Sequence, residues 1–296
     1  MKPIFQQLLE AKSILLEDFE DDAKTIMGKD LAGAVASLKT KASDSEFQQG
    51  ATSGKSDGAD DDEEVSSNTQ PVPATKMFPT QQEIGFGNSL EDLVKDKYEQ
   101  IDNAFNSPVE MSSADGKTPI LVANIGGSIA ILDGHHRWSL CFMINPDADM
   151  SCDILKGDFD SAEDALKAMQ FAIAAKAGKV VTKGFEGKDL MSTSTKEVEQ
   201  YIKDNIIDSA IEKFKKYKPE IFKGGDDDKD AVASYIGEAH KKIVKMKGPY
   251  TRPIMPQAGA SGVDQSDVNK ALAQGAINFN EPYIKEAFQI RAGIKK

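Results

Sequence analysis

The chain has 296 residues, of which 40% are hydrophobic and 28% charged, enough for more than one domain with a buried core. Its 48 acidic and 36 basic residues give a net charge of −12, which argues against broad nonspecific nucleic-acid binding, because such binding neutralises phosphates with lysine and arginine. Two cysteines exclude a disulfide-dense scaffold and a four-thiolate zinc site. With no apolar run near the roughly 20 residues of a membrane helix and no secretory signal, we expect a cytoplasmic protein without membrane contact.

The first 70 residues divide by composition into two segments. Residues 1–41 are predicted to form an amphipathic helical arm, because apolar residues recur at helical spacing, namely Ile4, Phe5, Leu8, Leu9, Leu15, Leu16 and Phe19. This arm either docks on a protein partner or packs on the chain's own domain. Residues 42–70 are rich in Ser, Gly, Asp and Glu, and such a composition buries too little apolar surface to offset its ordering entropy. We therefore predict an acidic low-complexity linker there.

Residues 71–180 show the alternation of extended and helical patterns that is typical of an α+β domain with a small mixed sheet. Two β-rich runs, residues 120–125 and 128–132, flank a Gly-Gly pair, which predicts a hairpin. The second run leads directly into D-G-H-H-R at residues 133–137, where a helical pattern begins. Residues 181–296 are predicted to form a mainly helical C-terminal region.

The D-G-H-H-R segment combines residue types that suit an anion site. A strand that ends in glycine and starts a helix directs backbone N–H groups and the positive end of the helix dipole at one spot. Gly134 permits close approach, and Arg137 can bind two phosphate oxygens at once. His135 or His136 can donate to an anion or act as acid or base, and Asp133 can orient a histidine or help hold a divalent metal. Adjacent histidines point in different directions, so no zinc is expected; the structural alternative is that they are only hydrogen-bonded surface groups.

These residues resemble the ParB/sulfiredoxin-like superfamily, which has G-x-H-R or G-E-R-R between a strand and a helix start. The resemblance extends upstream, where residues 72–84 (VPATKMFPTQQEI) are similar to the opening strand and P-x-Q segment of ParB-type domains. Downstream, residues 151–155 stand where that fold places its next strand. The resemblance covers about residues 70–180, and such domains also occur in bacteriophage-encoded proteins.

In this superfamily the G-x-H-R turn binds nucleotide phosphates. Known activities include CTP binding and hydrolysis, ATP-dependent sulfinic acid reduction, free-serine phosphorylation and proposed nuclease action. The resemblance implies that Gly134, His136 and Arg137 cradle the phosphates, with His135 and Asp133 beside them. It implies a nucleoside triphosphate, ATP or CTP, with Mg²⁺.

The resemblance also singles out Glu83, next to the P-x-Q position, as a candidate base or metal ligand. The candidate catalytic residues are then His135, His136, Glu83 and Asp133. His135 stands where sulfiredoxins have their cysteine, so sulfiredoxin chemistry is not expected. The chain also has neither a G-E-R-R motif nor a recognisable helix-turn-helix, so centromere binding is not expected. We expect a nucleotide- or phosphate-binding protein that carries out phosphoryl transfer or phosphodiester hydrolysis. The alternative is a non-catalytic scaffold of a larger assembly, such as a phage virion, with the arms as docking elements.

Overall fold

The structure is a computed structural model of the full chain. It describes residues 19, 21–52, 69–96, 98–106, 108–109, 112–113, 116–117, 119–155, 159–225, 227–273 and 276–277. The amphipathic helix predicted near the N-terminus lies outside the described residues apart from Phe19, and so does most of the predicted linker, residues 53–68.

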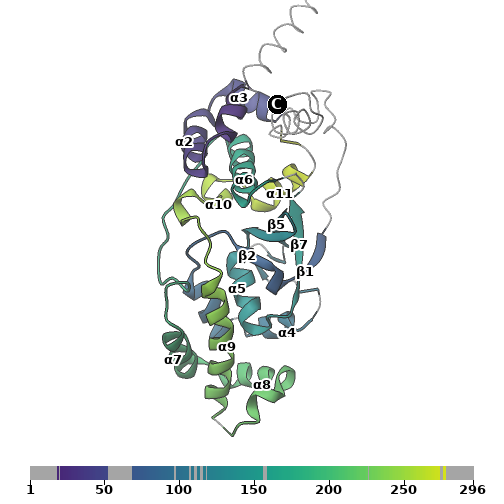
Figure 1. The fold of residues 1–296 in the computed structure, drawn as a ribbon, viewed down its shortest axis with the longest axis vertical. Coiled ribbons are helices and arrows are strands. Elements are labelled where there is room, and N and C mark those ends of the chain that lie inside the picture. Colours follow the sequence, from purple (N-terminus) through teal and green to yellow (C-terminus); the bar gives the residue numbers. More distant parts are fainter. Residues whose placement is uncertain are drawn as a thin grey trace, which may run out of the picture. The chain divides into compact units, whose positions relative to one another are not determined.

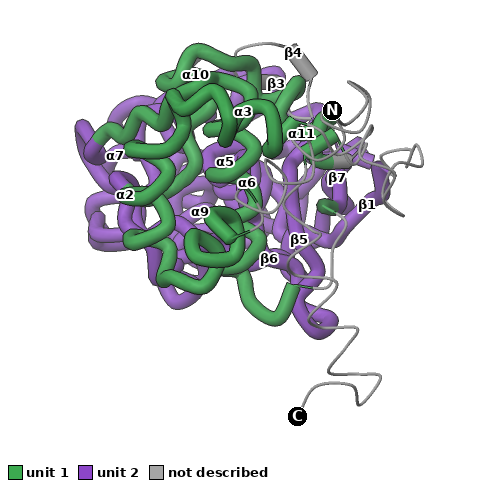
Figure 2. The backbone as a smooth tube through the Cα atoms, turned by 90° about the horizontal axis from the view of Figure 1, so that it is seen from above, with its two compact units in different colours: residues 1–67, 155–183, 254–296 green, residues 68–154, 184–253 purple. Residues whose placement is uncertain are grey.

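The chain divides into two compact units (Figure 2). Unit 1 combines residues 1–67, 155–183 and 254–296, and unit 2 combines residues 68–154 and 184–253. This division differs from the predicted boundaries at residues 70 and 180, because segments far apart in the sequence share each core. Each unit is described below by itself.

Unit 2 contains a five-stranded mixed sheet, which confirms the predicted α+β class (Figure 1). The strand order is β1 (Thr69–Pro73), β7 (Asp149–Leu155), β5 (Ile120–Ile125), β6 (Ser128–Asp133) and β2 (Met77–Pro79). Strands β5 and β6 pair antiparallel across the glycine turn, which confirms the predicted hairpin. Strand β2 runs parallel to β6, so the carboxyl ends of these two strands meet at the same edge of the sheet, where open α/β sheets commonly bind ligands.

The helices of unit 2 include much of the region predicted to be a separate C-terminal part. They are α4 (Gln100–Ala104), α5 (His135–Ile144), α7 (Thr195–Asn205), α8 (Asp208–Tyr217) and α9 (Asp228–Lys245), with the short helical segments η2 (Ala74–Lys76), η3 (Gly87–Asp96) and η4 (Pro219–Phe222). Helix α9 packs against both α7 and α5 (Figure 1). The apolar faces of α7 and α9 are buried in the core that also holds α5, because an amphipathic helix is stabilised mainly by burying that face. Two short strands, β3 (Ser112–Ser113) and β4 (Gly116–Lys117), form a separate pair.

Unit 1 is helical in its described part. It contains α2 (Leu31–Lys41), α3 (Ser45–Ala51), α6 (Ala162–Ala177), α10 (Ala258–Ser261) and α11 (Gln265–Ala273). Helix α6 was predicted as part of the sheet domain, but it packs against α2, α3 and α11, because nearly all of its residues after the first turn are buried. In both units, none of the described helices has the length and apolar character needed to cross a membrane.

Helix α3 corrects the predicted start of the linker at residue 42. Asp44 caps this helix by accepting the backbone N–H of Glu46 at 2.9 Å. The Phe47 ring packs against the rings of Phe19 and Phe171, with centroids 5.8 and 5.2 Å away. A capping aspartate and an aromatic contact thus help to hold a helix in a short segment whose overall composition is polar.

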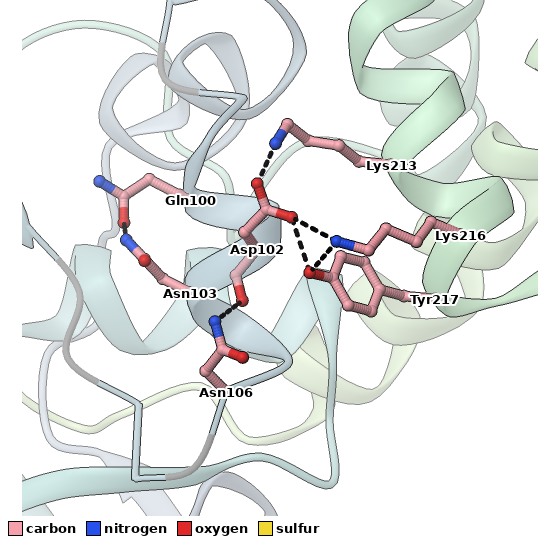
Figure 3. A network of polar contacts seen from close by, with 7 residues as sticks. All are labelled: Gln100, Asp102, Asn103, Asn106, Lys213, Lys216 and Tyr217. Atoms are coloured by element: carbon pink, nitrogen blue, oxygen red, sulfur yellow. Dashed lines mark hydrogen bonds and ion pairs between the residues drawn. The ribbon is translucent and has the colours of Figure 1, made fainter.

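A polar network in unit 2 joins α4 to α8 (Figure 3). The Asp102 carboxylate forms an ion pair with Lys213 and accepts a 2.7 Å hydrogen bond from the Tyr217 hydroxyl, while Lys216 lies 3.7 Å from it. These partners lower the pKa of Asp102 below its ordinary value, and the hydrogen bond from Lys213 has the largest effect. The Phe105 and Tyr217 rings stack with centroids 4.6 Å apart, so polar and apolar contacts reinforce one another there.

We expect Asp102→Asn to lower the free energy of unfolding of unit 2 by about 1 kcal/mol, because the amide keeps the shape of the side chain but loses its charge-assisted contacts. Urea unfolding followed by tryptophan fluorescence measures this, since Trp138 is the only tryptophan of the chain and is fully buried in unit 2. The control is Glu238→Gln, which removes an exposed pair with Lys241 on α9 and should shift the midpoint less. Equal shifts in the two variants would contradict the role given to the network.

Candidate functional site

The D-G-H-H-R segment forms the predicted strand–turn–helix. Strand β6 ends at Asp133, Gly134 has the left-handed backbone angle φ of 98°, and α5 begins at His135. A Cβ at Gly134 would lie 3.0 Å from an Arg137 guanidinium nitrogen and 3.1 Å from the Ile120 side chain, so glycine is required at this turn. No side chain of the N-cap residue caps α5, so its first-turn N–H groups depend on other acceptors.

His135 is buried and holds the segment that follows β2. Its Nε2 accepts the backbone N–H groups of Thr80 and Gln81, both at 3.2 Å. Two donors on Nε2 require the neutral imidazole with its proton on Nδ1. Burial lowers the pKa of His135 to about 3, and electrostatic interactions with His136 and Arg252 act in the same direction. His135 is therefore neutral at pH 7, and its geometry favours positioning over the predicted acid–base role.

His136 contacts a later point of the same segment. Its Nε2 accepts the backbone N–H of Gly85 at 2.9 Å. A Cβ at residue 85 would lie 3.0 Å from that nitrogen, so the glycine lets the imidazole approach the backbone. The two adjacent histidines thus fix residues 80–81 and residue 85, and Glu83 lies between these two points.

Arg137 forms an ion pair within the motif. One of its Nη atoms lies 3.2 Å from Asp133 Oδ2, and the other donates to the carbonyl oxygen of Pro119 at 3.4 Å. The Arg137 side chain is 12% exposed and that of Asp133 is 38% exposed. The Asp133 carboxylate is therefore accessible to solvent although it is paired.

Residues 248–252 also contact the segment after β2. The Tyr250 N–H donates to the Thr80 carbonyl at 3.1 Å, and the Gln82 N–H donates to the Tyr250 carbonyl at 2.7 Å. A Cβ at Gly248 would lie 2.3 Å from the Thr80 carbonyl carbon, which no side chain allows. This close backbone pairing brings Arg252 to the site.

Arg252 is the site residue that the sequence did not reveal. Its backbone N–H donates to the Glu83 carboxylate at 2.9 Å, and its guanidinium lies 3.4 Å from Gln81 Oε1. Burial lowers the pKa of the Arg252 guanidinium, while the nearby carboxylates of Asp133 and Glu83 act against this. In the sequence, Arg252 is notable only because its loop contains glycine and proline. No local pattern connects residue 252 to the motif at residues 133–137.

The carboxylates of the site contact arginines. Across the described ranges, no three His, Cys, Asp or Glu side chains are grouped as metal ligands. Asp133 is paired with Arg137, and Glu83 accepts the Arg252 N–H, so these two predicted metal ligands are engaged elsewhere. Two arginines and a helix start are the partners that phosphate oxygens take in proteins.

His135→Gln tests whether His135 is neutral in the folded protein, because an amide oxygen can accept the Thr80 and Gln81 N–H groups but does not titrate. A folded pKa of about 3 against an ordinary 6.5 means that the unfolded chain binds the proton first as the pH falls. The wild type therefore loses up to about 1.4 kcal/mol of stability per pH unit below about pH 6.5. We expect its advantage over the variant, measured by urea unfolding, to shrink between about pH 7 and pH 5. A difference in stability that stays constant with pH would contradict the neutral state of His135. His240 is also buried, but both proteins contain it, so its effect cancels in the comparison.

Comparison with known proteins found no relative of this chain: no protein family, curated protein or solved structure matches it. The superfamily resemblance of residues 133–137 therefore rests on the motif and on the strand–turn–helix that carries it. Function has to be argued from the geometry of the site.

Proposed function

We propose that unit 2 binds a phosphate-containing ligand, a nucleotide of the ATP or CTP class, at the start of α5. The observation that carries this proposal is that Arg137 lies at the Gly134 turn, 3.2 Å from Asp133, while Arg252, from a distant segment, contacts Glu83 and Gln81 beside the two histidines. A guanidinium group can bind two phosphate oxygens at once. At this turn a phosphate would meet the positive charge of Arg137 beside Asp133, whose side chain is 38% exposed.

The residues of the motif take different parts in this proposal. Gly134 allows the turn that leads into α5, Arg137 binds the oxygens of the ligand, and His136 lines the site while holding Gly85. His135 acts as a positioning residue, because its accepting nitrogen is already engaged by two N–H groups. Mg²⁺ would arrive with the nucleotide and neutralise part of its charge.

Turnover is a further step in the same proposal. The resemblance points to phosphoryl transfer or phosphodiester hydrolysis, for which His136 and Glu83 are the candidate proton-transfer groups. His136 Nε2 accepts the Gly85 N–H, so it takes up a proton only when that hydrogen bond is released. Glu83 is the better-placed base, since a carboxylate can hold the Arg252 N–H and still accept a proton.

The second candidate function is a non-catalytic scaffold inside a larger assembly such as a virion. The Arg137–Asp133 ion pair favours it, because this contact stabilises the turn without any ligand. The two candidates assign different consequences to the loss of Arg137, and one pair of measurements separates them.

We expect Arg137→Gln to weaken the binding of Mg²⁺–ATP and Mg²⁺–CTP by about 1.5–3 kcal/mol, the scale of a hydrogen bond to a charged group. Calorimetric titration measures the affinity, and urea unfolding followed by Trp138 fluorescence measures stability. The control is Lys223→Gln, which removes an exposed positive charge of the same unit and should leave both quantities unchanged. Unchanged nucleotide binding together with lower stability would remove the phosphate site and leave the scaffold.

A further inference from the structure

The peptide unit that joins Glu83 to Ile84 is held at both of its polar groups. Its N–H, on Ile84, donates to Asp189 Oδ1 at 2.9 Å. Its carbonyl oxygen, on Glu83, accepts a hydrogen bond from the side-chain amide of Gln81. Because a peptide unit is planar, fixing its N–H and its C=O fixes the orientation of the whole unit. Two side chains therefore orient the backbone of Glu83, the candidate base.

The backbone on either side of Asp189 pairs with the same segment after β2. The Leu190 N–H donates to the Ile84 carbonyl at 2.7 Å, and the Phe86 N–H donates to the Lys188 carbonyl at 2.8 Å. Asp189 thus meets the Ile84 N–H from a backbone that is already paired with this segment. It lies beyond residues 70–180, which the superfamily resemblance covers, so the resemblance assigns it no role.

The Asp189 carboxylate is itself held in place. Its Oδ1 also accepts the Met191 N–H at 3.0 Å, and the Asp189 carbonyl oxygen accepts the Thr193 hydroxyl at 2.7 Å. Hydrogen bonds from N–H groups to a carboxylate are stronger than those between neutral groups. Asp189 therefore provides the Ile84 N–H with a strong acceptor in a defined position.

The other end of Glu83 has its own contact. The Glu83 carboxylate accepts the Arg252 N–H at 2.9 Å, so Asp189 acts on the backbone of Glu83 and Arg252 on its side chain. A general base works only within hydrogen-bond reach of the proton that it takes up. A displacement of about 1 Å can lower a rate by up to about 100-fold, so what orients Glu83 also controls its use as a base.

We propose that Asp189 is a positioning residue for Glu83, which it orients through the Glu83–Ile84 peptide without touching the ligand. This inference rests on the turnover step of the proposed function. It assigns to the loop before α7 a part in the reaction, in addition to the parts of the motif and of residues 248–252.

The first test measures hydrolysis of Mg²⁺–ATP and Mg²⁺–CTP by the full chain as release of phosphate. In this reaction the oxygen of water bonds to the terminal phosphorus, the bond from that phosphorus to the nucleoside diphosphate breaks, and Glu83 takes up the proton of water. We expect Asp189→Ala to lower kcat about tenfold or more and to leave KM within about twofold, because the nucleotide is bound at Arg137. Asp189→Asn keeps an oxygen acceptor and should recover most of the loss. The control Thr193→Val removes a hydrogen bond from the same loop but not the one to Ile84, and should leave kcat unchanged.

The second test does not depend on turnover. Amide hydrogen exchange is followed by NMR at Arg252, which binds the Glu83 carboxylate. If Asp189 orients Glu83, Asp189→Ala should raise the exchange rate of the Arg252 amide about tenfold, the scale of one hydrogen bond to a charged group. A residue that held only its own loop would change exchange at Met191 and not at Arg252, and Thr193→Val should not change it at Arg252.

Unchanged kcat, or unchanged exchange at Arg252, in a folded Asp189→Ala variant would overturn the inference and leave nucleotide binding intact. Absence of hydrolysis in the wild type would remove the turnover step and the inference with it, whereas the titration of Arg137→Gln tests nucleotide binding separately. Trp138 fluorescence reports whether each variant is folded. If Asp189→Ala does not fold, Asp189→Asn and Asp189→Glu decide the case. The first keeps the acceptor in place and should remain active, while the second keeps the charge but moves the oxygens and should not; the reverse order would overturn the inference.

Discussion

The site depends on one buried hydrogen-bonding group, the imidazole of His135. Thr80 and Gln81 are almost completely buried, and their backbone N–H groups both end on His135 Nε2. A buried N–H without an acceptor costs about 1–3 kcal/mol, so a single neutral side chain at this position satisfies two such groups. The Thr80 hydroxyl completes the connection by donating to the Ile131 carbonyl of β6 at 2.6 Å.

Glu83 and Arg252 are placed through that segment. Because β2 and β6 are parallel, the segment after β2 leaves the sheet beside the motif, and the histidines hold it there. Residues 248–252 then pair with its backbone and bring Arg252 to Glu83. Three parts of the chain thus contribute charged groups to the site: the motif with Arg137 and Asp133, the segment after β2 with Glu83, and the loop with Arg252.

The sequence predicts what local patterns determine. The hairpin and the strand–turn–helix at residues 133–137 follow from periodicity and from glycines, and both are present. The units could not be predicted in this way, because the helical patterns of α6 and α9 do not indicate which core each helix joins, and only tertiary packing decides this. The separate roles of His135 and His136 could not be predicted either. Two adjacent histidines look alike in the sequence, but in the fold they bind different backbone groups. Arg252 depends on backbone pairing between residues 80–82 and 250, which leaves no trace in either segment alone.

The protonation state of His135 tests this account most directly. Imidazole ¹⁵N chemical shifts, followed as the pH is lowered from about 8 to about 4, distinguish the two neutral tautomers from the imidazolium. The account predicts that His135 carries its proton on Nδ1 and stays neutral throughout this range, since burial lowers its pKa to about 3. A proton on Nε2, or titration near the ordinary value of 6.5, would contradict it, because Nε2 could then not hold the Thr80 and Gln81 N–H groups.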